Sequence, residues 1–285
     1  MTHALTETTL RSLPVLEIES PLCTARLSLH GGQLLSFVPA GGQETLWVSP
    51  TAVGAPKAIR GGVPVCWPYF AKENQPADAV QHGFARTQPW TLEESREDGD
   101  GNVHVRLSLP ADPRTPLRLE QLLVFGAGLQ QALVTHNPGV EPVRITQALH
   151  SYFQVGDARR VTVEGLAGLD YTDKFTGRVF TQDGDWTLAD PRDPGRSDRV
   201  YHGAGGRYLI VDPVLGRRLR LSTTGSAAVV VWNPGQEGVQ GFTDVPPQAW
   251  PDFLCVEAAN AGRDVVSVAP GASVTLAQTL EVLPV

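Results

Sequence analysis

The sequence is short of the residues that would indicate a disulfide-bonded, membrane-spanning or nucleic-acid-binding protein. Its three cysteines, Cys23, Cys66 and Cys255, lie far apart and form no C-x-x-C pair, which is typical of reduced thiols. No run of eighteen apolar residues occurs, and the first twenty residues contain no apolar segment of the secretory kind. The formal net charge of −7 disfavours binding to nucleic acid or to an anionic membrane. We therefore expect a cytoplasmic protein with neither kind of partner.

Motifs for metals, nucleotides and nucleophilic serines are also absent from the sequence. The seven histidines are scattered, without H-E-x-x-H, H-x-H or a Cys/His cluster, so the sequence predicts no metal site. There is no P-loop and no G-x-S-x-G. The glycine-rich segment HGAGGRY, at 202–208, lacks the dinucleotide-binding spacing, and we interpret it as a hairpin turn.

Short strand patterns bounded by turn residues make up most of the chain. Apolar residues alternate over 103–109, and the segments 119–137 and 217–235 each predict a pair of strands. The 29 glycines and 23 prolines supply turns, and 41% apolar residues suffice for a core. These patterns predict an all-β fold, a β-sandwich in a single domain over 1–285, with residues 1–14 as a loose N-terminal extension. The Asp-, Pro- and Gly-rich segment 181–199 predicts one long loop of the kind that lines a site.

The segment KAIRGGVPVCWPYF, at 57–70, cannot form a regular helix. Pro64 and Pro68 lack the amide proton, and Gly61 and Gly62 leave the backbone free to adopt unusual conformations. We therefore expect a shaped loop or a bent strand edge that positions side chains around a ligand. In a chain this acidic, a phosphorylated ligand would need a local group of basic residues.

Two residues are candidates for acid and base chemistry. In VRITQALHSYFQV, at 143–155, alternation places His150 on the more polar face of a strand, where it is either a surface histidine or a catalytic group. Glu257 lies in DFLCVEAAN, a pattern typical of a buried strand. A buried carboxylate is costly unless it has a partner, so Glu257 is either a general base in a cleft or a structural residue paired with an arginine.

Seven segments in this order resemble a known family: IRGGVPVCWPYF, QHGFAR, LHSYFQVGD, YTDKFTG, SDRVY, VVVWNPG and CVEAAN. From about residue 15 to the end, the chain is similar to the glucose-6-phosphate 1-epimerase branch, the hexose-6-phosphate mutarotases, of the aldose 1-epimerase family. The resemblance implies a galactose-mutarotase-like β-sandwich with few short helices that acts on a sugar phosphate as a monomer. It implies no metal and no cofactor, and a sugar held in an open cleft across one sheet.

The resemblance also implies roles for seven residues. The acid and the base fall on His150 and Glu257, and the substrate-binding residues fall on Arg60, Gln81, Arg86 and Asp198, with His82 as a second histidine in the cleft. In this interpretation Glu257 takes the proton of the sugar O1 and His150 gives one to the ring oxygen. The two arginines would hold the phosphate through paired charge-assisted hydrogen bonds.

Three alternatives remain open at the level of sequence. A free-aldose 1-epimerase would use the same catalytic pair without binding phosphate. A glycoside hydrolase or lyase would need a second carboxylate about 5 to 9 Å from Glu257, which Asp198 could supply. A sugar-phosphate sensor or carbohydrate-binding module would keep the cleft without turnover. The two arginines disfavour the first alternative, and the presence of both His150 and Glu257 disfavours the last.

Overall fold

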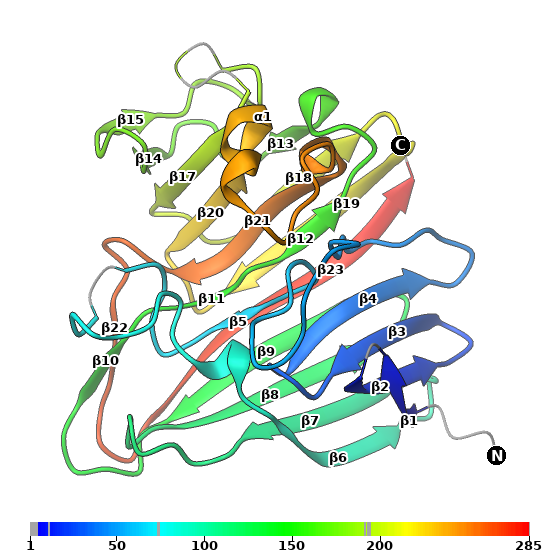
Figure 1. Ribbon diagram of the computed structural model, residues 1–285, viewed down its shortest axis with the longest axis vertical. Helices are drawn as coiled ribbons and strands as arrows, with labels where there is room; N and C mark the ends of the chain where they lie inside the picture. The colour runs from blue at the N-terminus through cyan, green and yellow to red at the C-terminus, as the bar shows by residue number, and fades with distance from the viewer. Residues whose placement is uncertain (1–4, 11, 73–74, 191, 193–194, 285) are drawn as a thin grey trace.

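The structure, a computed structural model, describes residues 5–10, 12–72, 75–190, 192 and 195–284. Within these residues the chain forms two large antiparallel sheets, a smaller sheet near the N-terminus and a separate pair of strands (Figure 1). All helical segments of this described part are short. The all-β prediction with few short helices is therefore confirmed.

The first large sheet carries the site described below, and we call it the cleft sheet. Its strands follow the order β15 (Val179–Thr181), β14 (Asp170–Asp173), β17 (Ser197–His202), β20 (Ala228–Asn233), β21 (Phe253–Asn260), β11 (Gln147–Leu149) and β5 (Val65–Cys66), and β12 (Tyr152–Gln154) also pairs with β21. Strand β21 is central and every one of its residues is buried. Its charged residue, Glu257, is therefore held in the interior of the sheet, as its sequence pattern predicts.

The second large sheet, the back sheet, covers the inner face of the first. Its order is β16 (Trp186–Thr187), β13 (Thr162–Glu164), β18 (Arg207–Asp212), β19 (Arg217–Thr224), β23 (Ser273–Pro284), β9 (Leu129–His136), β8 (Arg118–Phe125), β7 (Val103–Leu109) and β6 (Thr91–Glu97). Strands β6 to β9 lie side by side at the bottom of Figure 1, and β23 runs between β9 and β19. The predicted strand at 103–109 and the predicted pair within 119–137 are both confirmed.

The remaining elements are short or lie near the N-terminus. The N-terminal sheet has the order β1 (Leu5–Leu10), β2 (Leu13–Glu19), β3 (Cys23–Ser28) and β4 (Gln33–Pro39), β10 (Val143–Ile145) pairs with β22 (Val266–Val268), and the helical turns are η1 (Ala85–Thr87), η2 (Ala158–Arg160), α1 (Gly235–Gly238), η3 (Val239–Gly241) and η4 (Trp250–Asp252). Residues 1–4 and 11 of the expected loose extension lie outside the described residues. Residues 5–10 differ from that expectation, because β1 pairs along its whole length with β2.

The chain twice crosses between the large sheets where the sequence suggests a local hairpin. Strands β19 and β20, predicted as a pair, lie in different sheets, and HGAGGRY links β17 of the cleft sheet to β18 of the back sheet. Alternation shows that a segment is a strand but not which neighbour it joins. The expected long loop at 181–199 contains β16 and ends where β17 begins at Ser197, with residues 191, 193 and 194 outside the described part.

One apolar core joins the inner faces of the two large sheets. Leu254 and Val256 of β21 pack in the same cluster as Leu276 and Leu280 of β23. On the outer face of the cleft sheet a second cluster combines four alanines, at 148, 228, 259 and 261, with Cys66, Phe70, Val200 and Val230. Small side chains leave room above the sheet, and this is where the cavity of the candidate site lies.

Candidate active site

Strand register places His150 and Glu257 opposite each other. Ala148 of β11 lies opposite Ala259 of β21, and β12 continues in the same register against β21. His150 follows Ala148 by two residues and Glu257 precedes Ala259 by two, so the same pairing sets them face to face on one side of the sheet. His150 Nδ1 lies 3.5 Å from Glu257 Oε1. The predicted single strand over 143–155 is instead three short strands, β10, β11 and β12, and His150 stands at the last break.

Both groups of this pair are buried and incompletely bonded. The Glu257 side chain is 1% exposed and that of His150 is 11% exposed, so His150 is not a surface histidine. Among the described residues, neither His150 Nδ1 nor Glu257 Oε2 has a hydrogen-bond partner. The alternative of a structural glutamate paired with an arginine is therefore not what the structure shows. Unpartnered buried polar atoms are rare in folded proteins, so these two atoms make the pair a candidate for contact with a ligand.

Burial opposes charge on either member of the pair. It raises the pKa of Glu257 well above its ordinary value, and the nearby charge of Asp198 raises this pKa further. It lowers the pKa of His150 to about 3, an effect to which the positive charges of Arg86 and Arg60 add. Each group is therefore held in surroundings that disfavour its charged form.

A cavity of about 380 Å³ opens above the pair on the outer face of the cleft sheet. It is lined by Arg60, Phe70, Ala71, Gln81, His82, Arg86, His150, Tyr152, Lys174, Asp198, Val200, Val230, Trp232, Phe242 and Glu257. All seven residues to which the sequence resemblance gives roles are in this set. The structure therefore brings together segments that are up to about two hundred residues apart, while the roles themselves remain predictions.

Arg60 is held at the wall of the cavity by a fixed set of partners. Its Nε donates to Asp244 Oδ2 at 3.1 Å and its Nη1 donates to Tyr152 Oη at 3.0 Å, while the guanidinium lies over the Phe242 ring. Gly61 and Gly62 follow it, with φ of 105° and 62°, and a Cβ at Gly62 would lie 2.1 Å from the Leu34 carbonyl oxygen. The Gly-Gly pair is therefore required for this loop, and it fixes where Arg60 stands.

Arg86 is bonded much less completely than Arg60. It lies in η1, its Nη2 donates to the Gln81 carbonyl oxygen at 3.0 Å, and its buried Nε has no hydrogen-bond partner among the described residues. Lys174, on the turn between β14 and β15, lines the same cavity. Its backbone amide donates to the carbonyl oxygen of Asp198, which ties this turn to β17. Three cationic side chains therefore share one cavity in an acidic protein.

His82 faces the pair from the loop that precedes η1. Its ring centre lies 5.7 Å from that of His150, and its Nδ1 accepts a hydrogen bond from the Ala71 amide at 3.3 Å. The residue has a φ of 64°, an uncommon conformation for a side chain other than glycine. Burial, together with the charge of Arg86, lowers the pKa of His82 well below its ordinary value. His82 is thus a neutral imidazole held at an angle to His150.

The sequence reasoning missed several residues of this cavity. Tyr152 stacks on His150, with ring centres 4.9 Å apart and an interplanar angle of 9°. Its position two residues after His150 was a usable signal, because residues at that spacing share a face of a strand. Trp232 meets the same imidazole edge-on at 6.1 Å. Asp244, which anchors Arg60, lies 184 residues away in the chain, and no local pattern indicates that contact.

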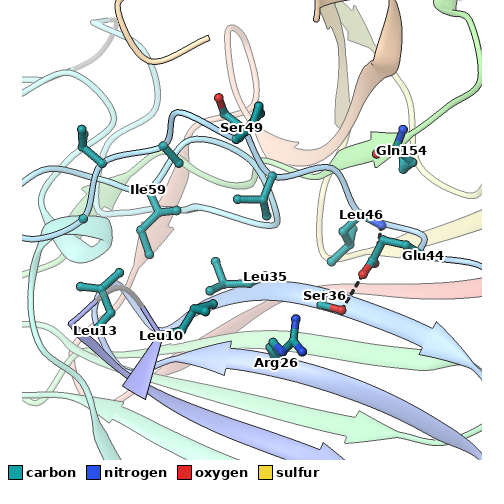
Figure 2. Close-up of a pocket in the computed structure, with 15 residues that line it drawn as sticks. Leu10, Leu13, Arg26, Leu35, Ser36, Glu44, Leu46, Ser49, Ile59 and Gln154 are labelled. Atoms are coloured by element: carbon teal, nitrogen blue, oxygen red, sulfur yellow. Dashed lines mark hydrogen bonds between the residues drawn. The ribbon is translucent and has the colours of Figure 1, made fainter. Parts of the chain in front are cut away.

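A second cavity of similar size lies elsewhere in the molecule. It has a volume of about 400 Å³ and is lined by leucines at 10, 13, 35 and 46, other apolar residues, and the polar Arg26, Ser36, Glu44, Ser49 and Gln154 (Figure 2). Both carboxylate oxygens of Glu44 accept hydrogen bonds. Oε2 accepts from Ser36 Oγ, and Oε1 accepts from the backbone amides of Phe37, Thr45 and Leu46. Among the described residues that line this cavity, no buried side-chain nitrogen or oxygen lacks a hydrogen-bond partner.

The described residues contain one cluster with the ligand types of a metal centre. His150, Cys255 and Glu257 offer ligand atoms that lie within 4.8 Å of one another. Burial, and then the nearby Glu257, raises the pKa of the Cys255 thiol well above its ordinary value. Two of the three residues are the His150–Glu257 pair, so this cluster is part of the candidate active site.

Comparison with known proteins assigns the chain to a family. The family described as aldose 1-epimerase matches residues 14–281. The chain belongs to the aldose 1-epimerase family. A candidate glucose-6-phosphate 1-epimerase of Escherichia coli (strain K12) is 36% identical over 266 residues, which cover 89% of this chain and 85% of that protein.

Solved structures agree with this assignment. A candidate mutarotase from Salmonella typhimurium is 31% identical with a TM-score of 0.90, and the match covers 100% of this chain and 95% of the other. A galactose mutarotase-like protein from Clostridium acetobutylicum, 13% identical with a TM-score of 0.75 over 99% and 98% of the two chains, has the same fold. The chain is therefore an enzyme of the epimerase or mutarotase type with a galactose-mutarotase-like β-sandwich. Among the described residues, no helix has the length and apolar character that crossing a membrane requires.

Proposed function

We propose that this aldose 1-epimerase family member interconverts the α and β anomers of a hexose 6-phosphate, with glucose 6-phosphate as the preferred substrate. The observation that carries the proposal is that one cavity holds three cationic side chains and the buried pair of His150 and Glu257, each of which has one atom without a hydrogen-bond partner among the described residues. The name of the Escherichia coli relative supports the choice of substrate. Three cationic side chains in the lining of one cavity suit a phosphorylated sugar better than a neutral one.

The reaction moves one proton at each of two oxygens. Glu257, as carboxylate, takes the proton of the hydroxyl at O1 while His150, as imidazolium, gives a proton to O5. The C1–O5 bond breaks, its electron pair goes to O5, and the electron pair of the O1–H bond forms the C1=O1 carbonyl. Rotation about the C1–C2 bond turns the carbonyl over, and the reverse transfers close the ring to the other anomer. Glu257 is then a carboxylate again and His150 an imidazolium.

The cationic residues divide into two roles in this proposal. Arg60 already binds Asp244 and Tyr152, so it serves mainly to fix Tyr152, whose ring stacks on His150. Arg86 has an Nε without a hydrogen-bond partner among the described residues, and it binds the phosphate together with Lys174, which lines the same cavity. Gln81 and Asp198 line the same cavity and bind sugar hydroxyls, as their family positions imply. The substrate thus spans from the cations to the catalytic pair.

The test is a direct comparison of glucose 6-phosphate with glucose. Exchange between the anomeric protons is followed by magnetisation-transfer NMR, with the enzyme-free rate subtracted. We expect kcat/KM to be at least about tenfold higher for the phosphate ester, since one charge-assisted contact contributes about that factor or more. Equal or faster turnover of glucose would instead identify a free-aldose epimerase. Binding of glucose 6-phosphate without any anomerisation would indicate a sensor, and release of reducing ends from an oligosaccharide would indicate a hydrolase.

A further inference from the structure

Three buried side chains at the candidate active site combine the ligand types that transition metals bind. The ligand atoms of His150, Cys255 and Glu257 all lie within 4.8 Å of one another. Cys255 and Glu257 are two residues apart on β21, so they share a face of that strand, and His150 meets Glu257 from the break between β11 and β12. No sequence motif indicates this cluster, because the histidine comes from a strand far away in the chain from the other two ligands.

We propose that His150, Cys255 and Glu257 form a binding site for Zn²⁺, and that the bound ion inhibits the enzyme. The inhibition rests on the proposed function, whereas the binding of the ion does not. The ligands select the ion, because Zn²⁺ binds imidazole nitrogen, thiolate sulfur and carboxylate oxygen together, whereas Mg²⁺ and Ca²⁺ require oxygen ligands. Bound Zn²⁺ occupies the imidazole lone pair and a carboxylate oxygen, so these atoms can no longer exchange protons with a sugar.

The spacing of the ligand atoms is close to that of a tetrahedral zinc site. Zinc lies roughly 2.0–2.2 Å from nitrogen and oxygen ligands and about 2.3 Å from sulfur, so two ligand atoms of one site stand roughly 3.3–3.8 Å apart. His150 Nδ1 lies 3.5 Å from Glu257 Oε1, which is within this range. The Cys255 sulfur lies no more than 4.8 Å from the other two ligand atoms. A movement of about 1 Å or less on the side of Cys255 therefore completes the site.

Two of the ligand residues have buried polar atoms that are available to an ion. Among the described residues, His150 Nδ1 and Glu257 Oε2 have no hydrogen-bond partner, and the Glu257 side chain is 1% exposed. Both residues line the cavity of about 380 Å³, so an ion can reach them from the solvent. The same cavity admits a water molecule as the fourth ligand, which a three-ligand zinc site requires.

The charges of the complex suit a buried position. An isolated thiolate or carboxylate is costly to bury, but the thiolate of Cys255 and the carboxylate of Glu257 together cancel the two positive charges of the ion. The thiol proton passes to the solvent when the metal binds. With a neutral imidazole the complex has no net charge. The cationic Arg60, Arg86 and Lys174 in the cavity lining therefore do not exclude it.

Cobalt(II) provides a direct probe of the site, because it occupies zinc sites and absorbs in the near ultraviolet when a thiolate binds it. We expect Co²⁺ to produce this absorption band with the wild-type protein and Zn²⁺ to remove it. Cys255→Ala should lack the band, and Cys255→Ser, which better preserves the size of the side chain, should lack it too. Cys66→Ala is the matched control, since it removes an equally buried thiol outside the cluster and should keep the band.

Affinity and inhibition are measured with the free Zn²⁺ concentration set by a metal buffer. Calorimetric titration should show that Cys255→Ala and Glu257→Gln each raise the Kd for Zn²⁺ by at least about a hundredfold, since loss of a ligand should cost no less than loss of its supporting contacts. Saturation with 1,5-anhydroglucitol 6-phosphate, which has no O1 and cannot react, should weaken Zn²⁺ binding because both occupy the cavity. Zn²⁺ should stop the anomerisation of glucose 6-phosphate and a chelator should restore it, whereas Mg²⁺ should have no effect.

Each outcome of these experiments supports or overturns the inference. A cobalt–thiolate band that is absent from the wild type, or that persists in both Cys255 variants, would overturn the metal site. Zn²⁺ that binds at the cluster without slowing glucose 6-phosphate turnover would overturn the inhibition. Failure of the proposed function has a different signature, because the metal-free protein would then not anomerise glucose 6-phosphate while Co²⁺ and Zn²⁺ still bound to it.

Discussion

The molecule has two cavities of nearly equal volume, and they differ in how far their polar atoms are used. The cavity on the cleft sheet measures about 380 Å³ and the one beside the N-terminal sheet about 400 Å³. Each contains a glutamate on its wall. Glu44 has a hydrogen-bond partner on both oxygens, whereas Glu257 has an oxygen with none among the described residues. Volume therefore does not distinguish the candidate active site, but unused bonding capacity does.

The difference in hydrogen bonding between Glu44 and Glu257 predicts that the same substitution changes protein stability in opposite directions at the two positions. A bonded glutamate such as Glu44 stabilises the loop around it, because it satisfies backbone amides that would otherwise be buried without a partner. Glu257 has a buried oxygen without a hydrogen-bond partner among the described residues, so its burial should cost stability. Glutamate-to-glutamine exchange at each position keeps the shape and removes the acid chemistry. It is therefore the sharpest means of testing the comparison between the two cavities.

The largest effect is expected for Glu257→Gln on catalysis. Glutamine cannot take the proton of O1, so kcat for glucose 6-phosphate should fall by about a hundred- to ten-thousandfold, the usual contribution of a general base. Binding should persist, and isothermal titration with 1,5-anhydroglucitol 6-phosphate would measure it. A variant that keeps more than about a tenth of the wild-type kcat would show that Glu257 is not the base.

The next effect concerns the cations of the cleft. Arg86→Ala removes a charge-assisted contact to phosphate, so KM for glucose 6-phosphate should rise by about ten- to a hundredfold. Turnover of glucose should be almost unchanged. Steady-state kinetics on both substrates, with the melting temperature of each variant, provide the measurement, and Arg26→Ala is the matched control. Equal losses on both sugars together with a lower melting temperature would instead identify Arg86 as a structural residue.

The pH dependence of stability separates the cost of Glu257 from that of His150. Folding raises the pKa of Glu257 above its ordinary value near 4.5. Its protonated carboxyl therefore contributes its full stability below pH 4.5, and this contribution is lost as pH rises through the raised pKa. Glu257→Gln should therefore be more stable than wild type, by a margin that grows by up to about 1.4 kcal/mol per pH unit. Urea denaturation at pH 5, 6, 7 and 8 measures that margin. A constant or shrinking margin would contradict the raised pKa.

His150 provides the complementary slope in the same experiment. Its pKa is lowered from 6.5 to about 3, so wild-type stability should decline as pH falls through this interval. His150→Gln should lack this acid-side decline and retain the decline that Glu257 causes at higher pH. If both single variants showed the same pH profile, the two groups would not titrate as a coupled pair in the way that their contact implies.

Much of the fold could be predicted from local patterns, because a strand with one buried face shows alternating apolar and polar residues in the sequence. Strands β7, β8 and β9 were found in this way, and β21 by its continuous apolar run. Partner choice could not be predicted. The chain passes from β19 in the back sheet to β20 in the cleft sheet within a few residues, and a turn sequence does not specify which sheet follows.

The candidate site shows the same division between local and distant information. Strand patterns alone made His150 and Glu257 candidates, whereas the five substrate-binding residues came from the family resemblance and not from spacing. The contact of Arg60 with Asp244 joins loops 184 residues apart, and only the folded chain reveals it. The lowered pKa of His150 likewise depends on burial and on the charge of Arg86, which lies far away in sequence. Electrostatics of this kind arises from the assembled cavity.

The smallest effect on activity, and the one that completes the comparison, is expected for Glu44→Gln. The neutral amide accepts hydrogen bonds more weakly than the carboxylate and presents a donor group where Ser36 Oγ now donates. The protein should lose about 1–2 kcal/mol of stability, seen as a lower urea midpoint with an unchanged m-value. Its kcat and KM for glucose 6-phosphate should stay within about twofold of wild type, because this cavity touches none of the reacting atoms. A loss of activity comparable to that of Glu257→Gln would show that the second cavity takes part in the reaction, and the distinction between used and unused carboxylates would then fail.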